Sequence, residues 1–548
     1  MSSRGPVGNS VIKPNMLFFR QTSVQKLQLY IVNLYANLEL QCLQHYFNVT
    51  VIDYDCDYNN VCDKFEPEIC FFELGTEMPV SLKIDNIKNN NSVPKLGFIK
   101  TDFYAGCRTK FLHERDQYGI DDFFCWQPPI EEYLPLEFTN KILYWPFFVD
   151  IDRYSKFQNE KTIPISLFGI AEKLEGNYNY YPWREMVKNQ ISAAFPLLTV
   201  PHPRLETTKM VVRDNDYISM INSSKFSITC GGFVNGIVAK HLEIPAARAC
   251  LVTEQNRTVE RFGFKDMINC IIANPEDIVE KVSLVMEDNK LRERITEAGF
   301  ELVKTKHSIL ARDQIKQWFE LNKVRRGTDQ IVQSEDFLKL EVKKNDVFSS
   351  LKKLTIGRKK SYSASSHIYE GKDRQYLCDG DAFFKRAEYI PAREEYSNYL
   401  KFAPYIPEHF LRICLCDLAE GNNEHVIYHL SRAINLQKDA YGSDRMDPSE
   451  ALILLLALFL GDQIQNLNTY FSGWKVVSSP YLRSLMKLIS KFAFDANLDL
   501  IEEYNCSIHE LPFENIRSFK QYVLKLSELN FDNEQTSIAI WAAELDLS

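Results

Sequence analysis

The chain has 548 residues and a formal net charge of -9, so it is too long for a single hydrophobic core and three or four domains are expected. Nucleic-acid binding needs a basic face, and the acidic balance therefore argues against nucleic acid as the main partner. No apolar signal region and no run long enough to cross a membrane is seen, so we expect a cytoplasmic protein. The 13 cysteines are scattered without a C-x-x-C pair, which is typical of reduced thiols.

After an N-terminal tail of residues 1–14, residues 15–148 alternate short apolar runs with longer amphipathic ones. Strands are predicted at 16–19, 49–52, 69–72, 95–100 and 122–126, and a long helix at 24–47. This alternation predicts a parallel sheet with helices on both faces, as in a Rossmann-like domain.

The same alternation begins again in residues 149–325. Strands are predicted at 164–169, 197–200, 226–230, 249–253 and 270–273. Helices are predicted at 184–195, 217–224, 238–248, 275–306 with a break near Asn289, and 311–323. Two successive α/β halves predict a ligand cleft at the carboxyl ends of both sheets.

The periodic pattern decays in residues 326–375, where Lys, Arg and Ser are frequent and aliphatic residues are few. We expect an exposed basic linker there.

Residues 376–548 are expected to be helical, with 449–460 as a buried helix. One set of small and large positions has the spacing of a tetratricopeptide repeat: Gly380, Phe383, Ala392, Tyr396 and Pro404. An imperfect second repeat follows 34 residues later, with the equivalent positions Cys414, Asp417, Val426, Leu430 and Ala433. This part is therefore expected to be an all-α, tetratricopeptide-like domain.

The segment 223–254 contains the pattern most suggestive of chemistry, a strand, a glycine-bearing loop, a helix and a second strand. Glycines at such a turn allow backbone N–H groups to approach a phosphate, and the helix N-terminus adds a favourable dipole. The helix carries Lys240 and Glu243 on one face, where they could meet a diphosphate and ribose hydroxyls. A loop followed by a surface ion pair is the alternative. The candidate binding residues are Gly231, Gly232, Asn235, Gly236, Lys240, Glu243 and Thr253.

This segment resembles the donor-binding region of GT-B glycosyltransferases, closest to group 1 and its spore-protein-like branch. Group 1 carries two glutamates eight positions apart; Glu243 matches the second, while Asn235 stands in place of the first. The resemblance implies two Rossmann-like domains and transfer of a sugar from a nucleotide-diphospho-sugar, without a metal ion or a separate cofactor. The departure at Asn235 puts the stereochemical outcome in doubt.

Two further features support the resemblance. A Y-P-x-R segment ends at Arg184, after the predicted strand that finishes in Gly169. The resemblance implies that Arg184 holds the donor diphosphate, and Gly169 is a further candidate binding residue. A solvent-facing arginine is the alternative. Residues 276–307 resemble the helices at the end of the family's second domain.

Carboxylates at two strand ends of the first half are candidates for the general base that deprotonates an acceptor hydroxyl. Asp102 follows the fourth predicted strand and Glu73 ends the third. Asp102 could instead cap the next turn. The D-Y-D sequence at 53–55 resembles a metal-binding signature, but we discount it because it lies in the half that does not bind the donor.

Two functions remain open. The first is a glycosyltransferase whose helical domain recognises a glycan or protein acceptor or mediates self-association. The second is a non-catalytic scaffold that keeps the two-domain fold and uses the helical domain for protein interactions.

Overall fold

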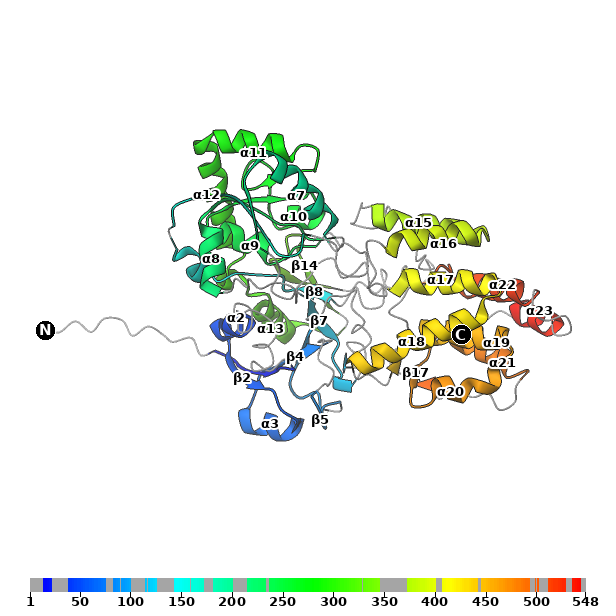
Figure 1. Cartoon of the computed structure of the whole chain (residues 1–548). Coiled ribbons are helices and arrows are strands. Elements are labelled where there is room, and N and C mark those ends of the chain that lie inside the picture. Colours follow the sequence, from blue (N-terminus) through cyan, green and yellow to red (C-terminus); the bar gives the residue numbers. More distant parts are fainter. Residues whose placement is uncertain are drawn as a thin grey trace.

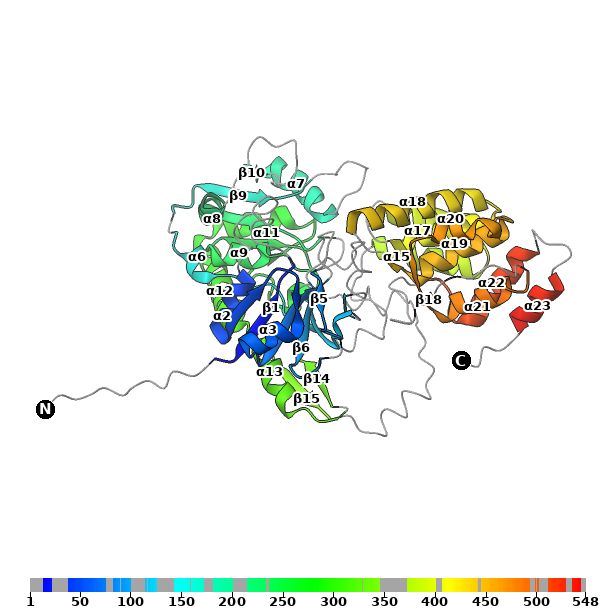
Figure 2. The same ribbon diagram turned by 90° about the horizontal axis from the view of Figure 1, so that it is seen from below.

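The computed structural model of the chain describes residues 13–21, 38–74, 82–88, 90–99, 114–115, 117–125, 142–157, 159–171, 181–200, 214–232, 236–327, 329–344, 372–400, 407–441, 445–492, 498, 500–501, 511–528 and 535–543. Figure 1 shows two α/β parts, coloured blue to green, beside a third part that consists mainly of helices. Figure 2 shows the same division from below. The expected fold class, two Rossmann-like domains followed by a helical part, is confirmed.

The first sheet contains six parallel strands in the order β2-β1-β4-β6-β7-β8. The strands are β1 (Asn15–Phe19), β2 (Asn48–Ile52), β4 (Ile69–Leu74), β6 (Lys95–Ile99), β7 (Asp122–Cys125) and β8 (Ile142–Tyr144). Every residue of β4 and β6 is buried, as expected for strands covered on both faces. The chain crosses from one side of β1 to the other between β2 and β4, so a topological switch point lies between β1 and β4.

Two helices of this half are described, α2 (Leu38–Tyr46) and α3 (Tyr58–Phe65). The helix expected at 24–47 is therefore confirmed only over α2, because residues 22–37 lie outside the described part. A short parallel pair, β3 (Cys56–Asp57) and β5 (Ile84–Asp85), flanks α3 and was not expected from the sequence.

The second sheet contains five parallel strands in the order β10-β9-β11-β12-β13. The strands are β9 (Ile163–Phe168), β10 (Leu197–Val200), β11 (Ser224–Ile228), β12 (Cys250–Thr253) and β13 (Ile271–Ile272), and the helices are α6 (Ile151–Ser155), α7 (Pro182–Ala194), α8 (Asp214–Asn222), α9 (Lys240–Ala246), α10 (Arg257–Arg261), α11 (Ile278–Glu287) and α12 (Asn289–Lys306). The break expected near Asn289 falls at Asp288, which caps α12. Here the switch point lies between β9 and β11.

The chain passes between the two α/β parts twice, and the two passages run side by side. Val149, on the way out, pairs with Ser308, on the way back. After the 3-10 helix η2 (Ile309–Ala311), helix α13 (Gln314–Val324) packs against the first sheet, with Phe319 in edge contact with Phe47. Figures 1 and 2 both show α13 among the elements of the first part. The first part thus includes a helix from residues assigned by the sequence to the second.

Arg312 joins these two passages. Its guanidinium donates from Nε to the Pro146 carbonyl at 3.1 Å and from Nη2 to the Phe147 carbonyl at 2.9 Å on the outward passage. On the return passage Nη1 donates to the Lys306 carbonyl at 2.9 Å, and Nη2 lies 2.6 Å from His307 Nδ1. Burial lowers the pKa of His307 well below its usual range, so the neutral ring accepts this bond at Nδ1 and donates from Nε2 to a carbonyl.

The linker expected at 326–375 is wrong for residues 330–343. These residues form an antiparallel hairpin of β14 (Gln330–Gln333) and β15 (Leu340–Lys343). Phe337 between the strands is 1% exposed, and the Gln333 side chain bonds both backbone groups of Tyr144 on β8. The hairpin is short, and its stability comes from burial against the first domain, which no local pattern reveals.

The third part is mainly helical, as expected. Its helices are α15 (Lys372–Lys385), α16 (Tyr389–Leu400), α17 (Pro407–Ala419), α18 (Asn423–Tyr441), α19 (Pro448–Leu460), the 3-10 helix η4 (Ile464–Asn466), α20 (Leu467–Phe471), α21 (Pro480–Ile489), α22 (Ile516–Ser527) and α23 (Gln535–Ala543). Every residue of α19 is buried, which confirms the expected buried helix at 449–460. Gly380 of α15 lies against the ring of Tyr396 on α16, where a Cβ atom would overlap that ring.

The expectation that this part is entirely helical is wrong in one respect. A small parallel sheet of β16 (Arg445–Met446), β17 (Lys475–Val477) and β18 (Leu500–Ile501) lies between the helices. Its strands have two or three residues each, too few to show a two-residue hydrophobic period. Among the described residues, no helix combines the length and the apolarity needed to cross a membrane.

Candidate functional site

Three predicted binding residues meet at the switch point of the second sheet. Gly169 follows the carboxyl end of β9 with φ of 104°, a conformation that favours glycine. A Cβ atom added to Gly169 would lie 3.3 Å from Arg184 Nη1 and 3.6 Å from Lys240 Nζ. Two cationic side chains, one from each of the helices α7 and α9, therefore converge on the same side of this glycine. Ligands of parallel α/β sheets bind at such a place.

Arg184 is almost fully buried, with 2% exposure, and several contacts hold its guanidinium in a fixed position. Nη1 donates to the Ile170 carbonyl at 2.8 Å, Nη2 lies 3.3 Å from the Cys230 carbonyl, and the ring of Tyr181 stacks on the guanidinium at 4.0 Å. Within the described part of the chain, Nε has no hydrogen-bond partner. The alternative of a solvent-facing arginine is thereby excluded. Of the five N–H groups of this buried cation, that of Nε and one of Nη1 have no partner among the described residues.

Lys240 is the first residue of α9 and is partly exposed. Burial lowers the pKa of its ammonium group; the nearby Glu243 charge opposes this shift, and Arg184 adds to it. Among the residues that the structure describes, no hydrogen bond or ion pair within 4 Å holds Nζ. A lysine beside a buried arginine is a favourable place for a bound anion, because an anion would offset the repulsion between the two cations.

Glu243, three residues after Lys240 on α9, is nearly inaccessible to solvent. Its side chain is 2% exposed and accepts a hydrogen bond of 2.6 Å from the Tyr217 hydroxyl on α8. The alternative of a surface ion pair is therefore wrong for Glu243. A role for this carboxylate in ribose binding stays a prediction, and a ligand hydroxyl would have to share it with Tyr217.

Thr253 ends β12 beneath α9, and its Oγ1 lies 2.9 Å from Nε2 of the fully buried His241. Burial lowers the pKa of His241 to about 3, so the ring is neutral at physiological pH. Thr253 and His241 thus fix the start of α9 to the sheet, and the predicted contact of Thr253 with a ligand remains untested.

The glycine loop is closed at its base by two residues that the sequence argument did not select. Gly231 N–H donates to Glu254 Oε1 at 2.8 Å, while Asn256 Nδ2 donates to that oxygen at 3.2 Å and to the Gly236 carbonyl at 3.3 Å. A Cβ atom on Gly231 would overlap the Gly236 carbonyl, so glycine is required for this close approach. The sequence feature that could have indicated Glu254 is its position directly after the end of a predicted strand. Gly232 has φ of 80°, and Asn235 lies outside the described residues.

We expect Glu254→Ala to weaken binding of a ligand at this loop by about 10-fold and to lower the free energy of unfolding by about 1–2 kcal/mol, because a buried N–H loses its acceptor. Glu254→Gln keeps an acceptor oxygen and should retain most of both properties. Calorimetric titration and chemical denaturation measure the two effects. Equal behaviour of the Ala and Gln variants would contradict this role.

The switch point of the first sheet also carries charged residues. Glu73 of β4 and Arg20, which follows β1, are both nearly inaccessible to solvent, and Arg20 Nε lies 3.6 Å from Glu73 Oε1. Gln21 Nε2 donates to the Glu73 carbonyl and to the carboxylate of the buried Glu114. Glu73 is therefore part of a buried polar cluster. Asp102 lies outside the described residues.

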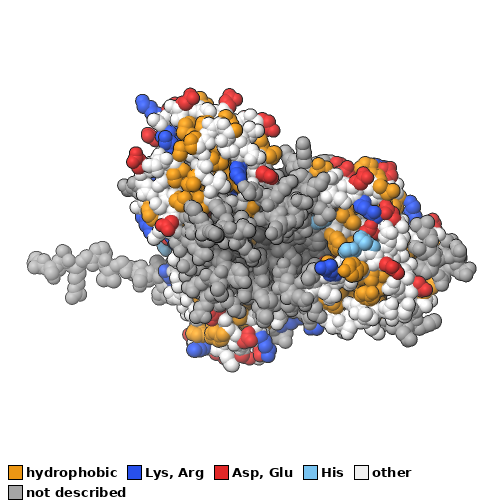
Figure 3. Space-filling model, in the orientation of Figure 1, with side chains coloured by type: hydrophobic (Ala, Val, Ile, Leu, Met, Phe, Trp, Pro, Cys, Tyr) orange, Lys and Arg blue, Asp and Glu red, His pale blue; other side chains and the backbone are white. Residues whose placement is uncertain are grey.

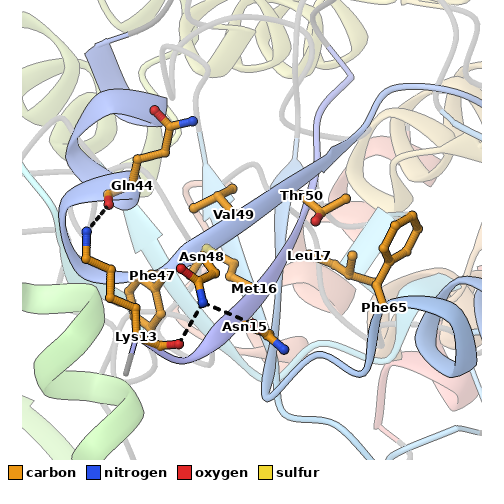
Figure 4. A pocket seen from close by; sticks show the side chains of 10 residues that line it. All are labelled: Lys13, Asn15, Met16, Leu17, Gln44, Phe47, Asn48, Val49, Thr50 and Phe65. Atoms are coloured by element: carbon orange, nitrogen blue, oxygen red, sulfur yellow. Dashed lines mark hydrogen bonds between the residues drawn. The ribbon is translucent and has the colours of Figure 1, made fainter. Parts of the chain in front are cut away.

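Two hollows away from Arg184 and Lys240 are lined by described residues. The first, of about 450 Å³, lies at the amino-terminal ends of β1 and β2. Figure 4 shows its lining of polar and apolar side chains, among which Asn48 donates to the Lys13 carbonyl and to Asn15. The second, of about 470 Å³, lies beyond the carboxyl ends of β12 and β13, between Gln255 and Lys281.

No metal centre with three or more ligands is formed in the part of the chain that the structure describes. The cationic pair at Gly169 is thus the arrangement with the clearest chemical character: it is suited to a phosphate or diphosphate group.

Comparison with known proteins shows what this segment is similar to. Residues 181–319 match the model of a glycosyl transferase-like family. The glycosyl transferase-like segment includes Arg184, the glycine loop, Lys240 and Glu243, and it ends within α13. No curated protein matches the chain.

Several solved structures are similar to part of the chain. They include HepE from Anabaena in complex with UDP and glucose, at 8% identity and a TM-score of 0.35 over 55% of this chain and 98% of that chain. Sucrose-phosphate synthase from Thermosynechococcus elongatus has 8% identity and a TM-score of 0.36 over 57% of this chain and 99% of its own. The C-terminal domain of a glycosyl transferase group 1 family protein, LpcC from Francisella tularensis, has 18% identity and a TM-score of 0.23. The match covers 29% of this chain and 99% of that chain.

Proposed function

We propose that the chain is a glycosyltransferase that moves a sugar from a nucleotide-diphospho-sugar donor to a glycan or protein acceptor in the cytoplasm. The observation that carries this proposal is the convergence of Arg184 and Lys240 on Gly169 at the switch point of the second sheet. The glycosyl transferase-like segment, which contains both cations, supports it.

The two cations account for the central chemical requirement of the reaction. As the bond between the sugar C1 and the diphosphate oxygen breaks, negative charge develops on the leaving nucleoside diphosphate. Arg184 can bind a phosphate through the second N–H of Nη1, the guanidinium nitrogen beside Gly169, and Lys240 adds a positive charge next to it. The proposed enzyme therefore stabilises its leaving group without a metal ion.

The glycine loop and α9 place the rest of the donor in this proposal. Gly231, Gly232 and Gly236 lie next to the diphosphate, Asn235 is a further candidate contact, and Glu243 accepts a hydrogen bond from a ribose hydroxyl. The acceptor hydroxyl loses its proton to a carboxylate of the first domain, with Asp102 as the first candidate and Glu73 as the second. Since Glu73 is buried beside Arg20, its use as a base requires an opening of that cluster.

The third part is proposed to be a tetratricopeptide-like domain that recognises the acceptor or a protein partner, or mediates self-association. The paired helices α15 and α16, and the contact between Gly380 and Tyr396, support this assignment.

The transferase is tested by calorimetric titration of the full chain with a panel of nucleoside diphosphates and nucleotide-sugars in the presence of EDTA. We expect one nucleotide series to bind at micromolar concentrations, and the matching nucleotide-sugar to release its nucleoside diphosphate on turnover. Absence of binding throughout the panel would support the alternative, a non-catalytic scaffold.

A further inference from the structure

Two histidines on the helical part lie one turn apart on the same face of α18. The His425 and His429 rings are 4.2 Å apart between centroids. Both residues are exposed, and Figure 3 shows histidine side chains at the surface of this part. Histidines at positions i and i+4 of a helix can direct one nitrogen each to a common metal ion, as two histidines do in helical zinc motifs.

A buried carboxylate orients the first of these rings. His425 Nδ1 lies 3.1 Å from Oδ2 of Asp417 on α17, and the Asp417 side chain is only 7% exposed. If Nδ1 carries the proton that Asp417 accepts, the lone pair of the neutral ring is on Nε2. A carboxylate behind a histidine is the usual second partner of a metal-bound imidazole, because it fixes both the tautomer and the ring orientation.

This carboxylate already has a cationic partner. Arg393 of α16 donates from Nη2 to the other Asp417 oxygen and to Glu420. Asp417 is therefore held in place and is not available as a direct ligand without breaking that pair. Among the residues that the structure describes, neither His425 nor His429 makes any hydrogen bond other than the one between His425 and Asp417. Both side chains are exposed at the surface.

We propose that His425 and His429 form a two-ligand binding site for a divalent transition-metal ion, oriented by Asp417. Imidazole ligands suit Zn²⁺, Ni²⁺ and Cu²⁺, and Cu²⁺ should bind most tightly of the three. The hard cations Mg²⁺ and Ca²⁺ prefer oxygen ligands and should not bind. Water fills the other coordination positions at this exposed surface. The site is independent of the proposed donor site.

The test is calorimetric titration of the untagged full chain with Zn²⁺, Ni²⁺, Cu²⁺ and Mg²⁺, with electron paramagnetic resonance of the Cu²⁺ form. One equivalent of each transition metal should bind, and the Cu²⁺ spectrum should report two nitrogen ligands. His425→Ala and His429→Ala should each weaken binding more than 10-fold. Asp417→Asn should weaken it about 10-fold with both ligands in place.

The chain has ten histidines, so a control is needed for metal binding at other histidines. His45→Ala is the matched control, because His45 is exposed on α2, and this variant should keep the metal affinity unchanged. Melting curves of all variants show whether Asp417→Asn lowers metal binding by destabilising the fold. If it does, the two His variants alone decide the test. Unchanged affinity and an unchanged Cu²⁺ spectrum in both His variants would overturn the proposal. Binding at millimolar concentrations only would overturn it as well.

Discussion

Replacing Lys240 with alanine is expected to lower kcat for sugar transfer by about 10²–10³-fold, because the leaving diphosphate loses a cation where its charge develops. The Lys240 ammonium lies on the same side of Gly169 as Arg184 Nη1, and no described carboxylate pairs with it. The melting temperature should change little, since Nζ makes no hydrogen bond within the described chain. Steady-state kinetics with the donor identified by titration measure the effect.

Lys290→Ala is the matched control, because Lys290 is an exposed lysine of α12 in the same domain. It should leave kcat and KM unchanged. If Lys240→Ala kept full activity while Arg184→Ala lost it, the proposal that the two cations act together would be wrong.

Replacing Arg312 with methionine is expected to lower the free energy of unfolding by about 3–4 kcal/mol. The carbonyls of Pro146, Phe147 and Lys306 and the Nδ1 of His307 would each lose a buried donor. Because these groups belong to the two passages between the α/β parts, both parts should unfold at a lower denaturant concentration. Chemical denaturation followed by tryptophan fluorescence and circular dichroism measures this.

Arg326→Ala provides the comparison, since Arg326 is exposed shortly after α13. Its effect should stay within about 0.5 kcal/mol. A change of similar size in both variants would mean that the passages are held together by packing alone, without a specific contribution from the Arg312 bonds.

The central strands of both sheets could be predicted because they are buried on both faces and form continuous apolar runs between turn residues. All residues of β4 and β12 are buried, for example. The hairpin β14–β15 and the small sheet at β17 could not be predicted in this way, because their stability depends on contacts distant in the sequence. Gln333 bonds Tyr144 across 189 positions of the chain.

The candidate site was predicted in part. The glycine loop and Lys240 follow from a local strand-loop-helix pattern, and Arg184 follows from a short motif. Their meeting at Gly169 depends on strand order, which places β9 beside β11 and cannot be read from either segment alone. Helical spacing also could not reveal that Tyr217, on another helix, covers Glu243.

The most direct test of the proposed donor site is an experimental structure of the full chain with the nucleoside diphosphate that binds in titration. The proposal predicts phosphate oxygens within hydrogen-bond distance of the Arg184 guanidinium and of Lys240 Nζ, above Gly169. A nucleotide whose phosphates lie elsewhere, such as in the hollow beside Gln255 and Lys281 with both cations unoccupied, would contradict it.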